Sequence, residues 1–214
     1  MIGLAIVVVA GLGLWIGAGL WDQRGIEEPA FPVVSRDGEA EVRLYEPTIV
    51  AATLVEGERD AALNEAFRRL AGYIFGKNKS RTEIAMTAPV SAEKSEKIAM
   101  TAPVSATSMA EGSFRVTFTM PASYTLETLP SPGRVGGVLE ADPRREVAAI
   151  RLWGWATSGA IDEHTAALQA WVAKSGRTAV GMPTLAQYDP PFMMPLMRRN
   201  EILIELAPAP APEA

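Results

Sequence analysis

The sequence contains few side chains of the kinds that usually act as nucleophiles, general bases or metal ligands. Their scarcity excludes several kinds of catalytic and metal site. The sequence has no cysteine and a single histidine, His164. It therefore lacks a thiolate nucleophile and any zinc site built from several cysteines or histidines. The serines have no base other than that histidine, and the carboxylates show no paired spacing, so no hydrolase constellation is evident. We expect a protein that is not an enzyme.

A methionine-rich segment near the C-terminus offers a different chemistry. Three methionines and two arginines follow one another closely there: Met193, Met194, Met197, Arg198 and Arg199. Thioethers are flexible and polarizable and adapt to flat apolar ligands, while a guanidinium can bind a carboxylate through two parallel hydrogen bonds. The segment is either a loop packed over the end of the domain or a flap over a ligand. The arginines either face solvent or a carboxylate such as Glu201, or contact an anionic group of that ligand.

Hydrophobic periodicity predicts the elements that position these side chains. In the first half we expect strands, a helix and a further strand at residues 42–45, 48–55, 60–75 and 113–120. The helix carries an apolar stripe made of Leu63, Phe67, Leu70 and Ile74. Asp60 is the expected N-cap and Gly76 the expected stop signal.

The second half repeats this order of elements. We expect strands at 134–140, 146–155 and 201–206, and a helix at 162–175 that Gly176 closes. A strand–helix–strand–strand pattern that occurs twice predicts an α+β fold, with two helices against a curved, largely antiparallel sheet and a pseudo-two-fold repeat.

The segment IAMTAPVSA occurs twice, at residues 84–92 and 98–106. Two copies are too few for a solenoid, so the repeat reads as a local duplication. Each copy alternates large and small side chains and then reaches a proline, which predicts a short strand that ends at the Ala-Pro pair. The two copies could pair as a hairpin through the charged residues between them.

The chain ends differ in composition from the middle. Residues 1–21 carry no charged side chain, and about 20 apolar residues span a bilayer, so we expect a transmembrane anchor or signal-anchor. A cleaved signal peptide and a buried helix are the alternatives; the first would usually show a basic residue before the apolar run. The remaining boundaries are a linker at 22–38, a folded domain at 39–206 and a disordered Ala/Pro tail at 207–214.

Charge bears on partners and on location. A formal charge of −5, without a basic stripe, argues against nucleic acid as a partner. The charge-asymmetry rule would keep Arg24, Arg36 and Arg43 on the cytoplasmic side, whereas long domains often translocate regardless of charge. We expect a membrane protein with its domain on the exported side.

Several short motifs together resemble the SOUL/haem-binding protein family. They are Leu44-Tyr45-Glu46, the helix end from Tyr73 to Asn78, the Met-Thr-Ala-Pro-Val of the repeat, Phe118-Thr119-Met120-Pro121, and Tyr188-Asp189-Pro190-Pro191 followed by Arg198-Arg199-Asn200-Glu201. The resemblance covers about residues 40–206. It implies a distorted antiparallel β-barrel flanked by two helices, which binds haem or another tetrapyrrole non-covalently in a shallow apolar groove beside the first helix.

The resemblance also suggests which residues contact the ligand. They are Phe67, Arg68 and Ala71 on the first helix, and Met193, Met194, Met197 and Arg198 in the C-terminal segment. His164 is the candidate iron ligand, because imidazole commonly ligates haem. However, Ile161 and Leu168 share its helix face, which is typical of a packed histidine, and the family's groove lies beside the other helix. We therefore expect binding without obligatory axial ligation.

Two other functions fit the same pattern of elements. The repeat is also similar to the effector-binding domains related to gyrase-inhibitory proteins, which would make this a membrane-tethered domain for a different hydrophobic ligand. A hydrolase on this scaffold would need a carboxylate and an aromatic side chain facing the cleft, and Glu201 and Tyr188 are the residues available for those roles.

Overall fold

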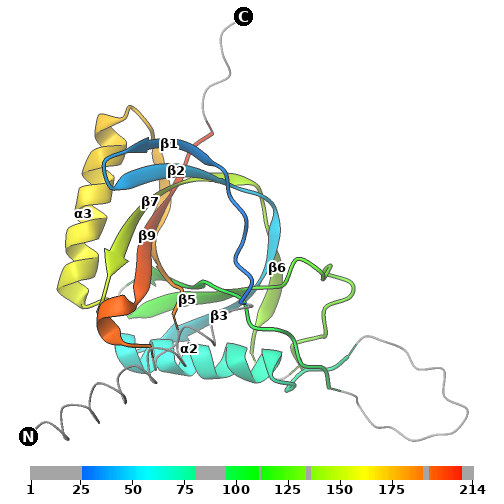
Figure 1. Cartoon of the computed structure of the whole chain (residues 1–214). Coiled ribbons are helices and arrows are strands. Elements are labelled where there is room, and N and C mark those ends of the chain that lie inside the picture. Colours follow the sequence, from blue (N-terminus) through cyan, green and yellow to red (C-terminus); the bar gives the residue numbers. More distant parts are fainter. Residues whose placement is uncertain (1–25, 81–94, 111, 134–135, 190–192, 209–214) are drawn as a thin grey trace, which may run out of the picture.

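The computed structural model describes residues 26–80, 95–110, 112–133, 136–189 and 193–208. Within these residues the chain forms one nine-stranded antiparallel sheet and two α-helices, which confirms the predicted α+β class. The sheet curves into an open ring rather than a closed barrel, and both helices lie outside it (Figure 1). The elements are β1 (Val33–Asp37), β2 (Ala40–Tyr45), β3 (Thr48–Glu56), α2 (Arg59–Ile74), β4 (Val104–Ala110), β5 (Ser113–Thr119), β6 (Val138–Asp142), β7 (Arg145–Trp153), α3 (Ser158–Lys174), β8 (Ala179–Gln187), the 3-10 turn η2 (Pro195–Met197) and β9 (Arg199–Leu206).

The strand order exchanges one strand between the two halves of the chain. The order is β1-β2-β7-β9-β8-β4-β5-β3-β6. Each half supplies three adjacent strands, but β2 of the first half pairs with β7, and β6 of the second half pairs with β3. The halves meet where β4 pairs with β8. The repeat expected from the sequence is therefore present, and its two units share strands.

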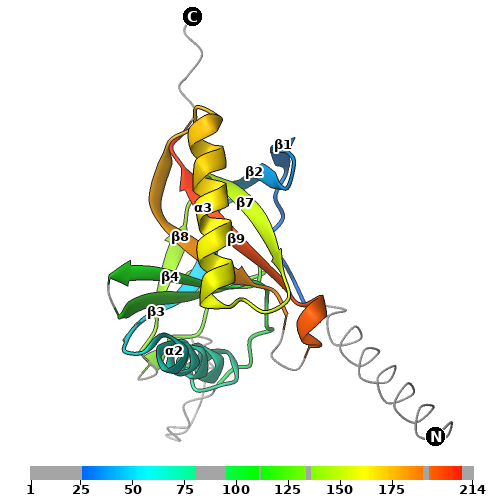
Figure 2. The same ribbon diagram turned by 90° about the vertical axis from the view of Figure 1, so that its left-hand side faces the viewer.

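Each helix covers its own part of the outer face of the sheet. Helix α2 packs on β3 and β5, and α3 packs on β7, β8 and β9 (Figure 2). The predicted N-cap at Asp60 is wrong, because α2 begins one residue earlier, after Glu58, which makes no capping hydrogen bond. Gly76 follows the helix with a φ of 106°, a conformation that glycine adopts without strain. Helix α3 also begins earlier than predicted, because Thr157 caps it by accepting a hydrogen bond from the backbone N–H of Ala160.

The repeated segment does not form the predicted strand. In the second copy, β4 begins at Val104, after the proline, instead of ending before it. From Val104 to Thr107 the strand pairs with β5 on one side and β8 on the other, so this stretch has no open edge for a hairpin with the first copy. The first copy, at 84–92, lies outside the described residues.

Two strands were missing from the sequence prediction. Strand β8 contains Gly181, with a φ of 73°, and Pro183, and its pairing with β9 shifts register between Val180 and Thr184. Glycine and proline inside a strand usually indicate a loop, and a local irregularity lets this strand tolerate them. Strand β1 falls in the segment that was read as a linker.

The folded domain begins earlier than residue 39. Ile26 and Phe31 pack against a buried cluster on the concave face of the sheet, and β1 pairs with β2. The predicted anchor at 1–21 and the tail from residue 209 lie outside the described residues. Among the residues that are described, no helix is both long and apolar enough to cross a membrane.

Candidate functional site

A groove of about 400 Å³ lies beside α2. Its walls are largely apolar and include Leu63, Phe67, Phe75, Met100, Val104, Ala106 and Val116. Polar side chains also line it, namely Asn64, Gln187, Asp189, Arg198 and Asn200. Small-molecule sites typically have volumes of roughly 300–1,000 Å³ and combine apolar walls with a few polar groups, so this groove can hold a ligand.

The helical wall of the groove comes from the edge of the α2 apolar stripe. Leu63 and Phe67 are one turn apart and lie on the same face of the helix. Ala66 and Leu70 are fully buried under the helix, which leaves Leu63 and Phe67 half-buried beside them. The Phe67 ring packs against Phe118 with 5.5 Å between the ring centroids. Phe67 therefore belongs both to the core and to the groove.

The second copy of the repeated segment also lines the groove, and it is docked on the end of α2. The Nδ2 atom of Asn78 donates to the carbonyls of Tyr73 and Glu96, each at 2.7 Å. The backbone N–H of Ile98 donates to the carbonyl of Ile74 at 2.8 Å. This docking brings the next residues to the groove, where the lining includes Met100, Thr101, Ala102, Val104 and Ala106.

These wall residues were missed in the sequence analysis. The Met-Thr-Ala-Pro-Val motif was specific enough to support a family resemblance, and its specificity was the available signal. By itself this motif predicts only a strand. A local pattern does not show which side chains of an extended segment face a helix far away in the sequence.

Of the predicted ligand-contacting residues, the structure places Phe67 and Arg198 on the groove. Ala71 lies on the buried side of α2, with 9% of its surface exposed. Arg68 points into solvent, where it forms an ion pair with Glu65 at 2.8 Å. Helix geometry explains this division, because successive residues turn by about 100° and only one stripe can face the groove.

The three methionines that were expected to form a flap, Met193, Met194 and Met197, are not among the described residues that line the groove. Met193 is buried. The Nε atom of Arg198 donates to the carbonyl of Met193 at 3.1 Å, and its guanidinium stacks on Trp155 at 4.7 Å from the ring centroid. The described part of this segment thus packs beside the β7–α3 loop, and of residues 193–199 only Arg198 lines the groove.

His164 lies on α3, away from the groove. It is half-buried, and its Nδ1 atom is 2.8 Å from the carbonyl oxygen of Ala160. It is not among the described residues that line the groove. In the described ranges, no three histidine or carboxylate side chains are grouped closely enough to hold a metal ion.

A buried ion pair occupies the concave face of the sheet. Arg43 donates to both carboxylate oxygens of Glu201, and to Glu41 at 2.6 Å. Burial by itself would lower the pKa of Arg43, but the hydrogen bonds and attraction from Glu201 outweigh it and raise that pKa. The ring of Phe31 covers the guanidinium at 4.3 Å.

Tyr188 connects this ion pair with the groove. Its hydroxyl donates to Glu201 at 2.8 Å, while its side chain lines the groove. Burial, together with the nearby Tyr45 and Glu201, raises the pKa of Tyr188 far above its usual range, so it remains a neutral donor. The residues suggested for a hydrolase are therefore in contact, but both oxygens of Glu201 already accept hydrogen bonds from Arg43 and Tyr188.

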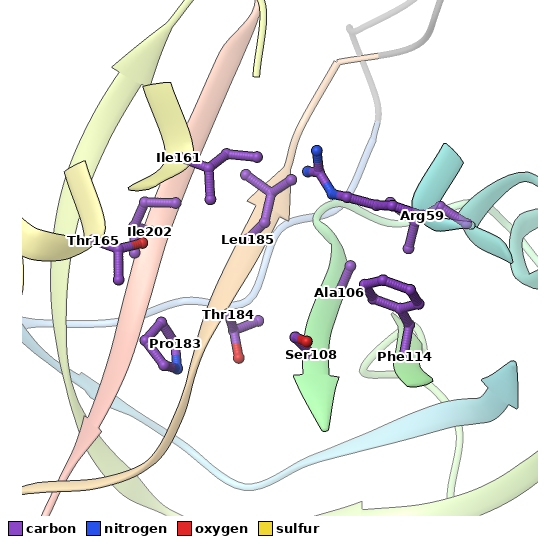
Figure 3. Close-up of a pocket in the computed structure, with 11 residues that line it drawn as sticks. Arg59, Ala106, Ser108, Phe114, Ile161, Thr165, Pro183, Thr184, Leu185 and Ile202 are labelled. Carbon is purple, nitrogen blue, oxygen red and sulfur yellow. The ribbon is translucent and has the colours of Figure 1, made fainter. Parts of the chain in front are cut away.

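Two other hollows fit a large flat anionic ligand less well. A cavity of about 90 Å³ lies between the helices, where Ile161 and Thr165 of α3 approach Leu185 and Arg59 (Figure 3). It has room for only a few water molecules. An open depression of about 590 Å³ is lined by Glu27, Glu28, Glu46 and Glu127, whose negative charges would repel a ligand that carries carboxylates.

Solved structures resemble this fold at low sequence identity. The C-terminal domain of EcmrR superposes with a TM-score of 0.56 at 12% identity, over 78% of this chain and 96% of that one. A structure described as a hydrolase from Listeria innocua superposes with a TM-score of 0.54 at 10% identity, over 81% and 94% of the two chains. At these identities the likeness shows the fold alone.

Sequence comparison is more informative about ancestry. Heme-binding protein 2 of Mus musculus is 41% identical over 56 residues, which span 26% of this chain and 27% of that protein. The SOUL heme-binding protein family matches residues 26–205, nearly the whole described domain together with the N-terminal residues that pack on its concave face. The match covers the groove, the strand exchange and the buried ion pair, and this chain belongs to the SOUL heme-binding protein family.

Proposed function

We propose that this protein binds haem or a related tetrapyrrole non-covalently in the groove beside α2, mainly by apolar contact. Family membership supports a tetrapyrrole ligand in general. The observation that carries the location is the groove itself, whose lining includes Phe67, Phe75 and Met100, and these side chains provide apolar surfaces for a flat ring. Aromatic rings and thioethers pack well against such surfaces.

Polar groups at the groove suit one end of such a ligand. Arg198 lines the groove and offers a guanidinium to a carboxylate, such as a propionate of haem. Asp189 lines it as well, but its carboxylate accepts the backbone N–H of Arg199. The side chain of His164 lies on the other helix, which supports binding without an obligatory iron–imidazole bond.

We infer a binding protein rather than an enzyme. The acid and the aromatic side chain considered for a hydrolase are Glu201 and Tyr188, and Glu201 accepts hydrogen bonds from both Tyr188 and Arg43 in the sheet interior. A carboxylate that already accepts several hydrogen bonds is a poor general base. No observation favours the alternative of a different hydrophobic ligand, because the solved structures share the fold alone.

Phe75→Ala tests the location of the ligand without disturbing the core. Phe75 lines the groove but is 59% exposed, so its loss should hardly change stability. Removing roughly 60 Å² of apolar contact should weaken binding about tenfold, at about 25 cal/mol per Å². The measurement is absorbance titration with hemin and with iron-free protoporphyrin, and both should weaken alike.

Leu54→Ala is the matched control, because Leu54 is 63% exposed on β3. It should bind both porphyrins as the parent does. If Phe75→Ala bound both porphyrins as tightly as the parent, the ligand would not bind in this groove. If the parent protein bound neither porphyrin, a different hydrophobic ligand would become the better proposal.

A further inference from the structure

Large apolar side chains gather on the surface where the β7–α3 loop meets η2. Trp153 and Trp155 are 61% and 60% exposed, and Leu196 and Met197 are 81% and 37% exposed. The two segments are joined, because the N–H of Gly154, between the tryptophans, donates to the carbonyl of Arg198 at 2.9 Å. Figure 2 shows η2 beside the end of β7. We call these four side chains the tryptophan patch.

The charged groups beside the patch are already engaged. The guanidinium of Arg198 stacks on Trp155 and donates to the carbonyl of Met193. Arg199 forms an ion pair with Glu28 at 2.5 Å. A partner of this surface would therefore be held by apolar contact rather than by charge. Contiguous exposed apolar side chains of this kind mark protein or membrane contacts.

The place where the N-terminal residues enter the domain favours a membrane over a protein as the partner of this surface. Ile26 lines the groove together with Arg198, and Glu28 pairs with Arg199, so the N-terminal end of the described domain lies next to the patch. Residues 1–21 carry no charge and are long enough to span a bilayer. The chain from Trp21 to Ile26 can extend no more than about 17 Å. A span in those residues would hold this surface at the bilayer.

We propose that the tryptophan patch docks on the interfacial region of a phospholipid bilayer. Tryptophan favours the headgroup boundary, where its ring is buried and its N–H stays hydrated, and leucine reaches the acyl chains below. Docking would orient the domain with Arg198 and the adjoining end of the groove near the lipid surface. The proposal does not depend on which ligand the groove holds.

The absence of cysteine permits a direct test. Leu196→Cys in the full chain provides a single thiol for a nitroxide label, and the labelled protein is reconstituted in phosphatidylcholine vesicles. Collision with oxygen, which concentrates in the bilayer, is compared with collision with a water-soluble nickel chelate. Met109→Cys is the control, because Met109 is 51% exposed near the end of β4, which points away from η2 in Figure 2.

We expect the oxygen-to-nickel collision ratio to be several-fold higher at residue 196 than at residue 109. Adding Trp153→Ser and Trp155→Ser to Leu196→Cys should bring that ratio down to the value of the control. Equal ratios at the two positions, or an unchanged ratio without the tryptophans, would overturn the proposal. So would a full chain that does not float with the vesicles. Label–label broadening at residue 196 that disappears on dilution with unlabelled protein would identify a second copy as the partner instead.

Discussion

At the scale of single residues, the ion pair of Arg43 and Glu201 is the most constrained feature of the domain. Its two members are 158 residues apart and have only 1% and 2% of their side-chain surfaces exposed. Charges that leave water lose solvation, which a partner with good geometry must replace. Glu201 has two such donors, Arg43 and Tyr188, and this saturation keeps a carboxylate in the interior.

Removing Arg43 should therefore be costly. Arg43→Met should lower the free energy of unfolding by about 3–5 kcal/mol, because the buried Glu201 would lose its hydrogen bonds from Arg43 and keep only the half-exposed Arg151, at 3.6 Å, as a counter-charge. Urea denaturation of the parent and the variant measures this difference. The double variant Arg43→Met, Glu201→Met should recover a large part of the loss, since it leaves no buried charge unpaired: Glu41 keeps its ion pair with Arg36, and Arg151 is exposed to solvent.

An exposed pair provides the comparison. Arg68 and Glu65 form an ion pair on α2 with 75% and 41% of their side-chain surfaces exposed, so Arg68→Met should leave the urea midpoint unchanged. Equal midpoints for Arg43→Met and the parent would contradict the structural role assigned to the buried pair.

At the scale of elements, the two helices have different tasks despite their equivalent places in the repeat. Helix α2 presents Leu63 and Phe67 to the groove, and the second copy of the repeated segment supplies further lining residues from Met100 to Ala106. Helix α3 buries Leu168 and Val172 against its part of the sheet. The repeat therefore duplicates the packing of a helix on a sheet, whereas the groove proposed to bind the ligand lies beside α2.

This difference predicts the behaviour of His164 on α3. His164→Ala should bind hemin within a few-fold of the parent, because His164 does not line the groove. The loss of an iron–imidazole bond would weaken binding more than tenfold, which corresponds to about 1.4 kcal/mol. Titration with hemin and with iron-free protoporphyrin measures this. Loss of the hemin spectrum with intact binding of iron-free protoporphyrin would instead make His164 the axial ligand.

At the scale of the whole molecule, the exchanged strands make the halves dependent on each other. Ala40 and Val42 of β2 are part of the buried cluster under α3. Leu139 of β6 in turn packs against the cluster under α2. Because each helix needs a strand from the other half to complete its core, neither half should be stable alone.

Dissection of the chain tests this interdependence. A fragment of residues 138–206 should be unfolded, because it lacks β2, and so should a fragment of residues 26–129, because it lacks β6. The intact domain should unfold in one transition, with coincident urea curves from tryptophan fluorescence and far-ultraviolet circular dichroism. A fragment with dispersed amide resonances, or two separate transitions, would show that the halves are independent.

The sequence by itself determined the features that depend on neighbouring residues. Alternation predicted β5, the apolar stripe with its glycine stop predicted α2, and the order of elements predicted the α+β class and the repeat. The motifs identified the family, and the resemblance suggested Phe67 as a groove residue, while the helix stripe showed only that Phe67 lies on the apolar face of α2. Side-chain periodicity reports which face of an element is buried, so a continuous segment is sufficient to read it.

Only the tertiary structure decided which segments meet. No local pattern distinguishes the pairing of β2 with β7 from a pairing within its own half, because both would bury the same faces. The presence of Met100 and Phe67 in one groove and the contact of Arg43 with Glu201 depend on strand pairing and on hydrogen bonds, such as those of Asn78, that join distant segments. The sequence thus specified the faces that must be buried, and the pairing order of the nine strands selected their partners, because only the assembled open sheet with both helices buries all of these faces together.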